Sequence, residues 1–326
     1  MMNSLIKIID KFKDRKILVL GDIMLDKYIW GDVSRISPEA PVQVVNVLKE
    51  TYAPGGAANV ANNLASFNSK SFMVGTIGKG DANNILINEL KKRKIDVNGI
   101  FIDSNRPTIQ KVRIIARSQQ LLRVDYEKKN YVDANIENKI LNFISGKING
   151  IDAVIVSDYA KGVVTKQLME KLTALCKNKG KMVVVDPKPQ HKKFYKNATI
   201  ITPNHSEAHQ MTGFAEEEIS DRDIERMGKK LLKDLNSNVL ITKGEKGMSL
   251  FEKNMAVTHI PTFAKEVYDV TGAGDTVVAS LCLALTSGAS FKQAAIIANH
   301  AAGITVGKIG TSTVNIDELK KSIENG

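Results

Sequence analysis

Hydrophobic positions along this chain form short continuous runs that alternate with longer segments of helical periodicity. The first run, Ile17-Leu18-Val19-Leu20, has no polar interruption, as expected for a parallel strand that is buried on both faces. The same character predicts strands at 16–20, 71–76, 97–102, 153–157, 182–185, 199–201 and 239–242. Helical periodicity and composition predict helices at 5–12, 55–67, 82–93, 134–148, 165–177, 221–235, 277–285, 291–306 and 317–323, with segment 307–311 ending the one before it. This alternation predicts an α/β fold with a doubly wound, mostly parallel sheet.

Two stretches interrupt the alternation and predict a smaller sheet. Residues 28–33 and 42–48 are rich in β-branched and aromatic side chains, and segment 35–41 between them has two prolines that exclude a helix. Residues 110–117 and 119–125 are also strand-like, and basic residues alternate there with apolar ones. We predict that these strands form a small β-sheet lid on the main sheet. The lid segments lie near 27–50 and 107–125, within one domain that spans 1–326.

Polar residues follow the predicted strands of the main sheet. Ligands of doubly wound sheets bind at the carboxyl ends of the strands, so these side chains are candidates for a binding crevice. The alternative is that the aspartates only cap turns. The candidates are Asp22 and Asp26 after 16–20, Lys161 after 153–157, Asp186 after 182–185, Asn204 and Glu207 after 199–201, and Lys243, Gly244 and Gly247 after 239–242.

The segment Asp269-Val270-Thr271-Gly272-Ala273-Gly274-Asp275 precedes the helix predicted at 277–285. Small residues at a helix start leave backbone N–H groups open to an anion, and the helix dipole favours negative charge there. A carboxylate in such a place repels the ligand unless it accepts a proton. Asp275 is therefore a candidate base for a hydroxyl that attacks a phosphoryl group. The alternative is an ordinary N-cap in a glycine turn.

Composition narrows the class of protein. The chain has 326 residues and is 43% hydrophobic, but its apolar stretches are too short to span a bilayer, and we interpret the first apolar segment as a helix and not as a signal peptide. The two cysteines, Cys176 and Cys282, have no metal-like spacing, which favours a reducing, cytoplasmic location. The formal charge of +11 could reflect nucleic acid, anionic small substrates or solvated lysines. The lysines are scattered, with no basic run interleaved with aromatics, so we expect neither a nucleic-acid nor a membrane partner.

Two common phosphate-binding motifs are absent from the sequence. G-x-x-x-x-G-K-[ST] does not occur, and Gly272-Ala273-Gly274 lacks the third glycine of a dinucleotide fingerprint. We therefore expect phosphoryl transfer by a different arrangement. It combines anion-binding amides at 272–275, a base at Asp275, and metal-organising groups at Asn204 and Glu207.

The chain resembles the ribokinase-like carbohydrate kinases, also called the PfkB family, over nearly all of its 326 residues. The resemblance is carried by three segments in the right order: Gly55-Gly56-Ala57-Ala58-Asn59, then Thr202-Pro203-Asn204 with Glu207, then the segment that ends at Asp275. It implies a three-layer α/β/α kinase that uses ATP with Mg²⁺, with a monovalent cation as a further option. A homodimer formed through the lid is implied as well.

The resemblance also implies roles for individual residues. Asp275 would be the catalytic base, and Gly272, Ala273 and Gly274 would form the anion hole. The remaining assignments are Asp22, Asp26, Gly55, Gly56, Asn59 and Asp186 for the sugar, then Asn204, Glu207, Lys243, Gly244, Gly247, Thr271 and Asn299 for ATP, and Glu207 with Asn204, through water, for the metal.

A narrower resemblance is to the kinases of ADP-heptose synthesis within this family. It is carried by segments 25–28, 31–42, 119–123, 157–162 and 185–188, with two departures, at Gln43 and Arg117, where those kinases have proline and histidine. It implies phosphorylation of D-glycero-β-D-manno-heptose 7-phosphate at its anomeric hydroxyl, to the 1,7-bisphosphate used for lipopolysaccharide core. The substrate's own phosphate would need basic side chains, which could equally be solvated edge charges. The candidates are Arg35, Lys111, Arg113, Arg117, Arg123 and Lys161.

Three alternatives stay open at this point. They are another sugar or sugar-phosphate kinase of the family, a nonenzymatic sugar- or nucleotide-sensing protein on the same fold, and a basic nucleic-acid binder. Some of the narrower relatives continue into a nucleotidyltransferase domain with an H-x-G-H motif, and no two histidines here have that spacing. We therefore expect the kinase domain alone, without a nucleotidyltransferase domain.

Overall fold

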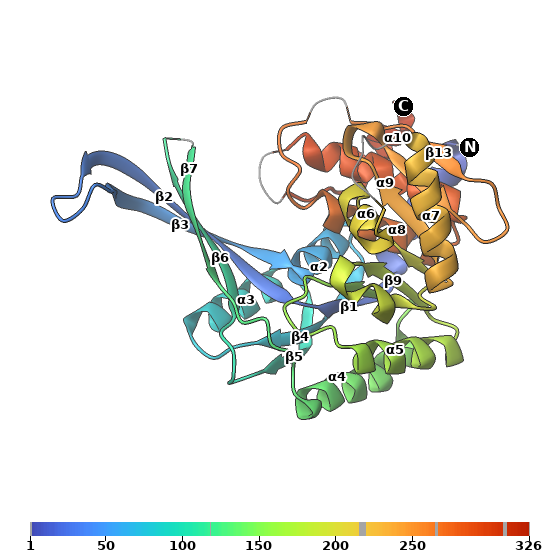
Figure 1. Ribbon diagram of the computed structural model, residues 1–326, viewed down its shortest axis with the longest axis horizontal. Coiled ribbons are helices and arrows are strands. Elements are labelled where there is room, and N and C mark those ends of the chain that lie inside the picture. Colours follow the sequence, from blue (N-terminus) through green and yellow to red (C-terminus); the bar gives the residue numbers. More distant parts are fainter. Residues whose placement is uncertain (1, 118, 215–219, 265–266, 309–311, 326) are drawn as a thin grey trace.

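The computed structural model describes residues 2–117, 119–214, 220–264, 267–308 and 312–325. Within these, nine strands form a main sheet in the order β13-β12-β11-β10-β9-β8-β1-β4-β5. Neighbouring strands are parallel except that β12 pairs antiparallel with β11 and β13, so the sheet is mostly parallel, as the sequence predicts (Figure 1). The strands are β1 (Lys16–Gly21), β4 (Lys70–Ile77), β5 (Asp96–Ile102), β8 (Ala153–Ser157), β9 (Met182–Asp186), β10 (Ile200–Ile201), β11 (Asn238–Thr242), β12 (Met248–Phe251) and β13 (Thr258–Ile260).

Helices connect these strands and pack on the main sheet. Helices α7 and α9 have the predicted bounds, and Ser220 and Ser290 begin them with capping boxes. No helix among the described residues is long and apolar enough to cross a membrane. The helices are α1 (Met2–Ile9), α2 (Ala57–Ser66), α3 (Asp81–Lys92), α4 (Ala134–Lys147), α5 (Lys166–Asn178), α6 (His205–Thr212), α7 (Asp221–Leu235), α8 (Ala273–Thr286), α9 (Phe291–Val306) and α10 (Ile316–Glu324), with short 3₁₀ helices at Phe12–Asp14, Ile148–Gly150, Pro189–Tyr195 and Gly244–Lys246.

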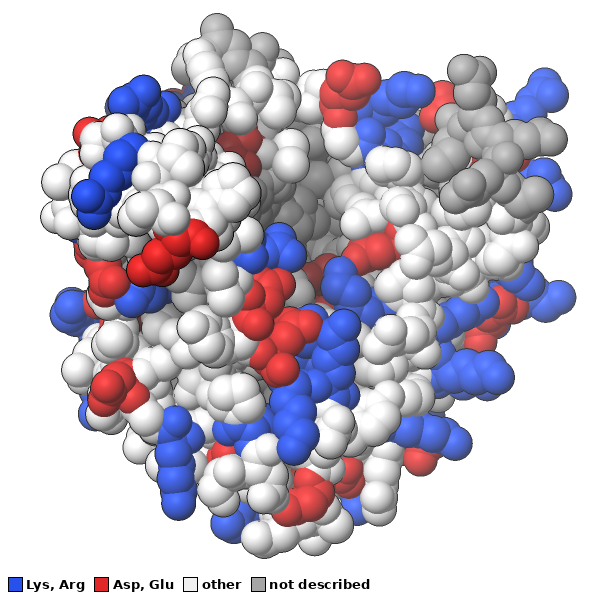
Figure 2. All heavy atoms as spheres, turned by 60° about the vertical axis from the view of Figure 1, so that its left-hand side comes forward, with Lys and Arg blue, Asp and Glu red and all other residues white. Residues whose placement is uncertain are grey.

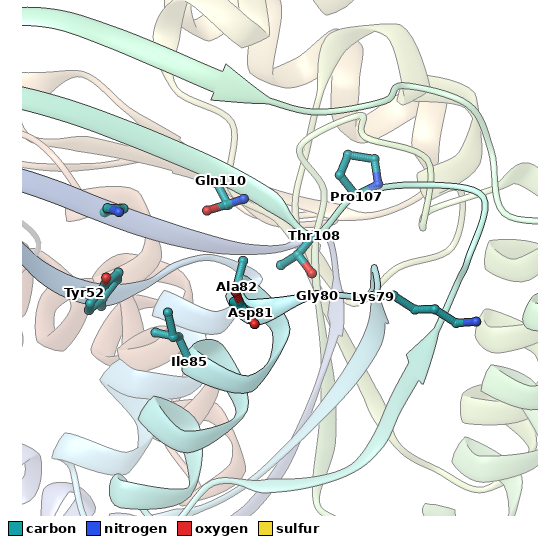
Figure 3. Close-up of a pocket in the computed structure, with 10 residues that line it drawn as sticks. Tyr52, Lys79, Gly80, Asp81, Ala82, Ile85, Pro107, Thr108 and Gln110 are labelled. Carbon is teal, nitrogen blue, oxygen red and sulfur yellow. The ribbon is translucent and has the colours of Figure 1, made fainter.

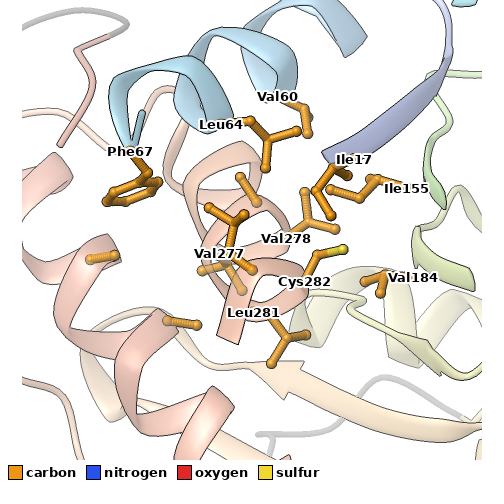
Figure 4. Packing of buried hydrophobic residues seen from close by; sticks show 14 of the residues in the cluster. Ile17, Val60, Leu64, Phe67, Ile155, Val184, Val277, Val278, Leu281 and Cys282 are labelled. Carbon is orange, nitrogen blue, oxygen red and sulfur yellow. The ribbon is translucent and has the colours of Figure 1, made fainter. Parts of the chain in front are cut away.

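Both faces of the main sheet are buried, because successive residues of a strand point to opposite sides. Ile17 and Val19 of β1 pack into one core with α1, α2, α8, α9 and α10. Leu18 and Leu20 pack into the other core with α4, α5, α6 and α7. Figure 4 shows the first core, in which Val278 and neighbouring side chains of α8 lie among residues of α2 and the main sheet. The uninterrupted hydrophobic runs are therefore explained by helices on both faces.

Four strands form a second sheet in the order β3-β2-β6-β7, which is the small sheet that the sequence predicts. Its strands are β2 (Ile23–Ile36), β3 (Gln43–Gly56), β6 (Ile109–Ala116) and β7 (Gln119–Tyr126). In Figure 1 this sheet projects from the main body, with the outer ends of β2 and β3 farthest away. Large apolar side chains are exposed on its strands and on the β2–β3 connection: Trp30, Ile36, Val42, Val47, Leu48, Leu121, Leu122, Val124 and Tyr126.

The inner ends of β2 and β3 differ from the prediction. β2 begins at Ile23 and not near residue 28, and Gly56 ends β3 instead of belonging to a helix. Gly56 has a φ of +55°, and a side chain there would meet the carbonyl oxygen of Asp22 at 2.6 Å, so the sharp turn into α2 requires glycine. The inner ends of β2 and β3 are thus buried in the main core and attach the second sheet to it. Of the segment predicted to end α9, residues 309–311 lie outside the described residues.

Candidate active site

Asp275 lies in the first turn of α8, most of which is buried in the core. Gly272 caps this helix with a φ of +82°, and a side chain there would meet Asn59 Nδ2 at 3.0 Å, so the position favours glycine. The first amides of an α-helix have no acceptor within the helix, and the helix dipole is positive at that end. The amides of Gly274 and Asp275 are therefore suited to an anion, in line with the predicted role of segment 272–275.

Asp275 is buried, and both of its carboxylate oxygens accept hydrogen bonds. Asn59 Nδ2 donates to Oδ2 at 2.7 Å, and the Tyr159 hydroxyl donates to Oδ1 at 3.0 Å. Burial raises the pKa of Asp275 from 3.8 to about 6, against the effect of the two hydrogen bonds. The charge of Asp26 also raises this pKa, and that of Lys188 lowers it. A carboxylate with this pKa is ionised at neutral pH and is basic enough to accept a proton in a transition state.

A pocket of about 160 Å³ surrounds this carboxylate. It brings together predicted site residues from distant parts of the chain, namely Asp186, Asn204, Glu207, Gly272, Gly274 and Asp275. Tyr159 and Lys188 line it as well, although the sequence does not single them out as site residues. Two local signals could have found them: each closely follows the end of a main-sheet strand, β8 or β9, and each lies in a segment that carries the narrower resemblance, 157–162 or 185–188.

A second pocket, of about 400 Å³, adjoins the first, because both include Thr242, Gly274 and Val277 in their walls. Its lining is mostly apolar and contains the predicted residues Gly244, Gly247, Ala273 and Asn299. A crevice with an apolar chamber at one end and a polar chamber at the other fits a nucleotide, with the base in the first and the phosphates in the second.

Lys243 and Thr271, which the sequence also assigns to ATP, line neither pocket. The Lys243 side chain pairs with Asp221 at 3.2 Å, and the Thr271 amide donates to Asp269 at 2.9 Å. These two residues stabilise the neighbouring turns of the chain, and the structure gives them no direct place in the crevice.

Asn204 and Glu207 form a capping box at the start of α6. The Asn204 side chain accepts a hydrogen bond from the Glu207 amide at 2.8 Å, and Glu207 Oε2 accepts one from the Asn204 amide at 3.0 Å. Glu207 Oε1 is paired with Lys188 Nζ. Among the residues that the structure describes, no group of three or more His, Cys, Asp or Glu side chains could hold a metal ion. A divalent cation in this pocket would therefore need oxygen ligands from a bound nucleotide as well.

Asp26 lies where the two sheets join, on the side that faces Asp275. Arg113 Nη1 donates to Asp26 Oδ1 at 2.6 Å, and a side chain at Gly55 would meet Asp26 Oδ2 at 2.5 Å. Asn59 Oδ1 is buried and has no hydrogen-bond partner among the described residues. An acceptor of this kind beside Asp275, together with Asp26, suits the hydroxyl groups of a sugar.

Acidic and basic side chains alternate beside Asp26. Lys111 and Arg123 both pair with Asp125, at 3.3 and 2.9 Å, and Lys161 pairs with Glu127 at 2.6 Å. Figure 2 shows such charges interleaved around a hollow on the side of the molecule where the second sheet comes forward. Each basic residue predicted here for a phosphate already has a carboxylate partner, so a phosphate would have to compete for it.

The structure does not support the predicted contact between Asp22 and the sugar. Asp22 is completely buried, and its two oxygens accept hydrogen bonds from the amides of Tyr159, Lys161 and Val163, each at 3.0 Å. These bonds occupy the carboxylate inside the protein. Asp22 instead holds the loop that carries Tyr159 to Asp275.

Arg35 and Arg117 also lie away from the other predicted residues. Arg35 follows Asp26 by nine residues on β2, which at about 3.3 Å per residue is roughly 30 Å along the strand. Arg117 pairs with Asp32 at 3.5 Å, and its side chain is 74% exposed. The alternation of basic and apolar residues is the same at both ends of a strand, so it could not separate the inner arginine, Arg113, from the outer ones.

A separate pocket, of about 300 Å³, lies between α3 and the inner end of the second sheet (Figure 3). Tyr52, Ile85 and Gln110 are among the residues that line it. Neighbouring residues of a strand point to opposite faces, so Gln110 lies on the other face of the sheet from Lys111 and the site around Asp275. This pocket is not part of that site.

Comparison with known proteins agrees with this geometry. Residues 14–318 match the pfkB family carbohydrate kinase. The chain is 45% identical over 316 residues to the bifunctional protein HldE of Desulfatibacillum aliphaticivorans, with 96% of this chain and 64% of that protein covered. It is 44% identical over 308 residues to HldE of Geobacter metallireducens, with 94% of this chain and 62% of that protein covered. The chain thus spans less than two thirds of the length of these relatives.

Among solved structures, the ribokinase of Arabidopsis thaliana complexed with ribose and ATP matches with a TM-score of 0.71 at 20% sequence identity. The match covers 95% of this chain and 97% of the ribokinase chain. The likeness shows that the main sheet, its helices and the second sheet form a ribokinase-like fold.

Proposed function

Because the chain belongs to the pfkB family of carbohydrate kinases and is a phosphotransferase with an alcohol group as acceptor, we propose that it phosphorylates D-glycero-β-D-manno-heptose 7-phosphate. ATP is the proposed donor and the anomeric hydroxyl the proposed acceptor, which gives the 1,7-bisphosphate used in ADP-heptose synthesis for lipopolysaccharide core. The family itself establishes a sugar kinase. The similarity to HldE proteins supports the heptose phosphate, as does the narrower resemblance carried by segments 31–42, 157–162 and 185–188.

The Asp275 carboxylate is the observation that carries the proposal. It lies at the N-terminus of a buried helix, beside amides suited to a phosphoryl group, and its pKa is raised to about 6. A nonenzymatic sensor on the same fold has no use for a base at this point. The buried, hydrogen-bonded carboxylate therefore favours an enzyme over a sensor.

In the proposed reaction, the anomeric oxygen attacks the γ-phosphorus of ATP while Asp275 accepts the hydroxyl proton. The new O–P bond forms as the bond from the γ-phosphorus to the bridging oxygen breaks, and the electron pair of that bond leaves with ADP. Amides of Gly274 and Asp275 stabilise the charge on the phosphoryl oxygens in the transition state. Asn59 and Tyr159 orient the carboxylate throughout. An anomeric hydroxyl is more acidic than an ordinary alcohol, so a carboxylate is a sufficient base.

Mg²⁺ that enters with ATP would neutralise the phosphate charges, which is the chemistry that this ion supplies in phosphoryl transfer. The residues present fit such an ion, because Asp186 and Glu207 line the phosphate pocket and carboxylate oxygen is a preferred ligand. We assign Glu207, with Asn204, to a contact through water. Burial together with the charge of Glu207 raises the pKa of Asp186, and a nearby cation would favour the ionised form of Asp186.

The phosphate of the substrate is proposed to lie beside Arg113 and Lys161. Both side chains are mostly shielded from solvent, with exposures of 16% and 15%, and both are paired with carboxylates that a phosphate could replace. Charge-assisted hydrogen bonds from partly buried donors are among the stronger polar contacts. A phosphorylated sugar can offer these donors a charged partner in place of the carboxylate, whereas a neutral sugar cannot.

A homodimer through the second sheet is also proposed. Leu48 and Leu122 are 76% and 54% exposed and belong to the set of exposed apolar side chains on its strands. Such a set on one small sheet is more than the singly scattered apolar residues that are normal on a protein surface. A second copy of this chain would cover them by a two-fold arrangement. Light scattering should give twice the chain mass for the unmodified protein and the single chain mass for Leu122→Asp.

The substrate assignment is tested by ADP release with heptose 7-phosphate, unphosphorylated heptose, ribose and fructose 1-phosphate. Loss of one charged hydrogen bond costs about 1.5–3 kcal/mol, and 1.4 kcal/mol is about a factor of ten. We therefore expect the KM of unphosphorylated heptose to exceed that of heptose 7-phosphate at least about tenfold. Equal turnover of any other sugar in the panel would contradict the heptose assignment and favour a different sugar kinase of the family.

A further inference from the structure

The phosphate pocket is rich in carboxyl groups. Asp186, Glu207 and Asp275 line it, and Lys188 is the single basic side chain among the described residues in its walls. A phosphoryl group that enters this pocket is itself negative, so these carboxylates repel it unless a cation lies close by. Lys188 is the cation that this part of the chain provides.

Lys188 lies at the phosphate end of the crevice and not at its apolar end. It lines the pocket that contains Asp275 but not the adjoining apolar pocket. Its Nζ lies 5.5 Å from the centroid of the Tyr159 ring, and the hydroxyl of that ring donates to Asp275. If the nucleoside occupies the apolar pocket, the terminal phosphate is therefore the group that comes closest to Lys188.

A hydrogen-bond network of buried side chains holds the backbone of Lys188 in place. Its amide donates to the Tyr195 hydroxyl at 2.9 Å, and that hydroxyl donates to Asp158 Oδ2 at 2.6 Å. His191 Nδ1 also contacts Asp158 Oδ2, at 2.6 Å. Tyr195 and Asp158 are completely buried. The main chain of Lys188 is thus fixed, while its side chain, 31% exposed, can reach into the pocket.

We propose that Lys188 is a further catalytic residue of this kinase, one that contacts the γ-phosphate of ATP. In the structure its ammonium group is paired with Glu207. On nucleotide binding it moves to the terminal phosphate, and Glu207 Oε1 becomes available to a metal ion. An ammonium group has three donors on a flexible stem, so a small movement is enough for this exchange. The inference rests on the proposed use of ATP and deepens it by naming the residue that recognises the transferred group.

The test compares the binding of ATP and ADP, measured by calorimetry in the presence of EDTA. A contact to the γ-phosphate affects ATP and not ADP, and the absence of metal removes any effect that passes through a metal ion. Loss of a hydrogen bond between charged groups costs about 1.5–3 kcal/mol, and 1.4 kcal/mol is about tenfold in Kd. We expect Lys188→Met and Lys188→Gln to raise the Kd of ATP at least about tenfold and to leave the Kd of ADP within about twofold.

Lys192→Met is the matched control. Lys192 lies four residues further along, on the 3₁₀ helix Pro189–Tyr195, and pairs with Asp234 at 2.7 Å, outside both pockets. This variant removes the same charge from the same segment, so a long-range effect of net charge would appear in it as well. We expect it to bind both nucleotides as the unmodified protein does.

A purely structural role for Lys188, through its pair with Glu207, is separated by a double-mutant cycle. Glutamine at position 207 can keep the capping box, so Glu207→Gln removes the charge while leaving α6 intact. If Lys188 contacts the phosphate, Lys188→Met should still weaken ATP selectively in the Glu207→Gln background. If the double variant matches Glu207→Gln alone, or if ATP and ADP weaken equally, the inference is wrong. An unmodified protein that binds ATP neither with Mg²⁺ nor in EDTA would instead overturn the proposed function, and the inference with it.

Discussion

The two sides of the candidate site are built in different ways. The phosphate side belongs to the main sheet, where the buried side chains of Asp275 and Glu207 are held in the first turns of two helices by hydrogen bonds and a capping box. The sugar side belongs to the second sheet, where Asp26, Arg113 and their neighbours are held by ion pairs on a sheet with much exposed surface. Backbone and helix geometry fix the first set, whereas the second set can exchange partners. A family can therefore keep one chemistry and change the sugar, because only the second side has to be rebuilt.

The largest effect is expected on the phosphate side. Asp275→Asn removes the proton acceptor but keeps the size of the side chain and much of its hydrogen bonding. Positioned proton transfer is worth about 10²–10⁴ in rate, so kcat should fall at least about a hundredfold. The Kd of ATP, measured by calorimetry, should stay within a fewfold of its original value. Near-normal turnover would show that Asp275 is not the base, and it would contradict the division into a phosphate side that carries the chemistry and a sugar side that selects the substrate.

A smaller effect is expected on the sugar side. Arg113→Ala removes a charged hydrogen-bond donor worth about 1.5–3 kcal/mol, so the KM for the sugar phosphate should rise at least about tenfold. The KM for ATP should barely change, because Arg113 lines neither nucleotide pocket. Steady-state kinetics with each substrate varied in turn measures both constants.

Arg117→Ala is the matched control for this experiment. Arg117 belongs to the same sheet but pairs with Asp32 near its outer part, so the KM for the sugar phosphate should not move. Since Arg113→Ala leaves Asp26 without its partner, thermal melting should be recorded for both variants. An equal rise in KM for both, or a rise for ATP as well, would contradict the division between the two sides.

The smallest effect is expected at Tyr159, where the loop held by Asp22 meets the base. The rate requires ionised Asp275, so kcat/KM should fall as the pH drops through about 6. The Tyr159 hydrogen bond lowers this pKa, so Tyr159→Phe should raise it and move the acidic limb to higher pH by about half to one unit. Substrate phosphates titrate equally with both enzymes, so the difference between the profiles isolates the protein group. An unchanged limb would show that Tyr159 does not act on the base.

The hydrophobic pattern of the sequence predicts helices and strands well where residues within the same segment determine their bounds. Helices α7 and α9 have the bounds that periodicity predicts, and in the structure Ser220 and Ser290 form capping boxes with Asp223 and Gln293 at their starts, so a local signal coincides with each start. The inner end of β2 was missed because its first residues are buried by a junction of two sheets, which no short pattern reveals. The periodicity of hydrophobic residues indicates which face of a segment is buried. It does not indicate where the chain passes from the main sheet into the second sheet.

The site was predictable where a single segment carries the chemistry and less so where distant segments meet. Asp275 and its glycines are contiguous, so their arrangement follows from one helix start. Tyr159 contacts Asp275 across 116 residues of sequence, and nothing near either residue reports that contact. Asp22 shows the reverse error, since a carboxylate after a strand has the same local pattern whether it binds a ligand or the backbone of a neighbouring loop.

The second sheet is attached to the main core near Ile23, at the inner end of β2, and extends far from that point. Asp26 is only three residues from Ile23, where β2 leaves the core, while the outer end of the strand lies about 30 Å farther along at about 3.3 Å per residue. A rotation of about 10° about Ile23 would carry the outer end, roughly 43 Å away, through about 7 Å, but would displace Asp26, roughly 10 Å away, by less than about 2 Å. A partner or substrate that tilts the sheet would therefore move its outer end much farther than Asp26 and Arg113, which lie near the point where the sheet joins the core.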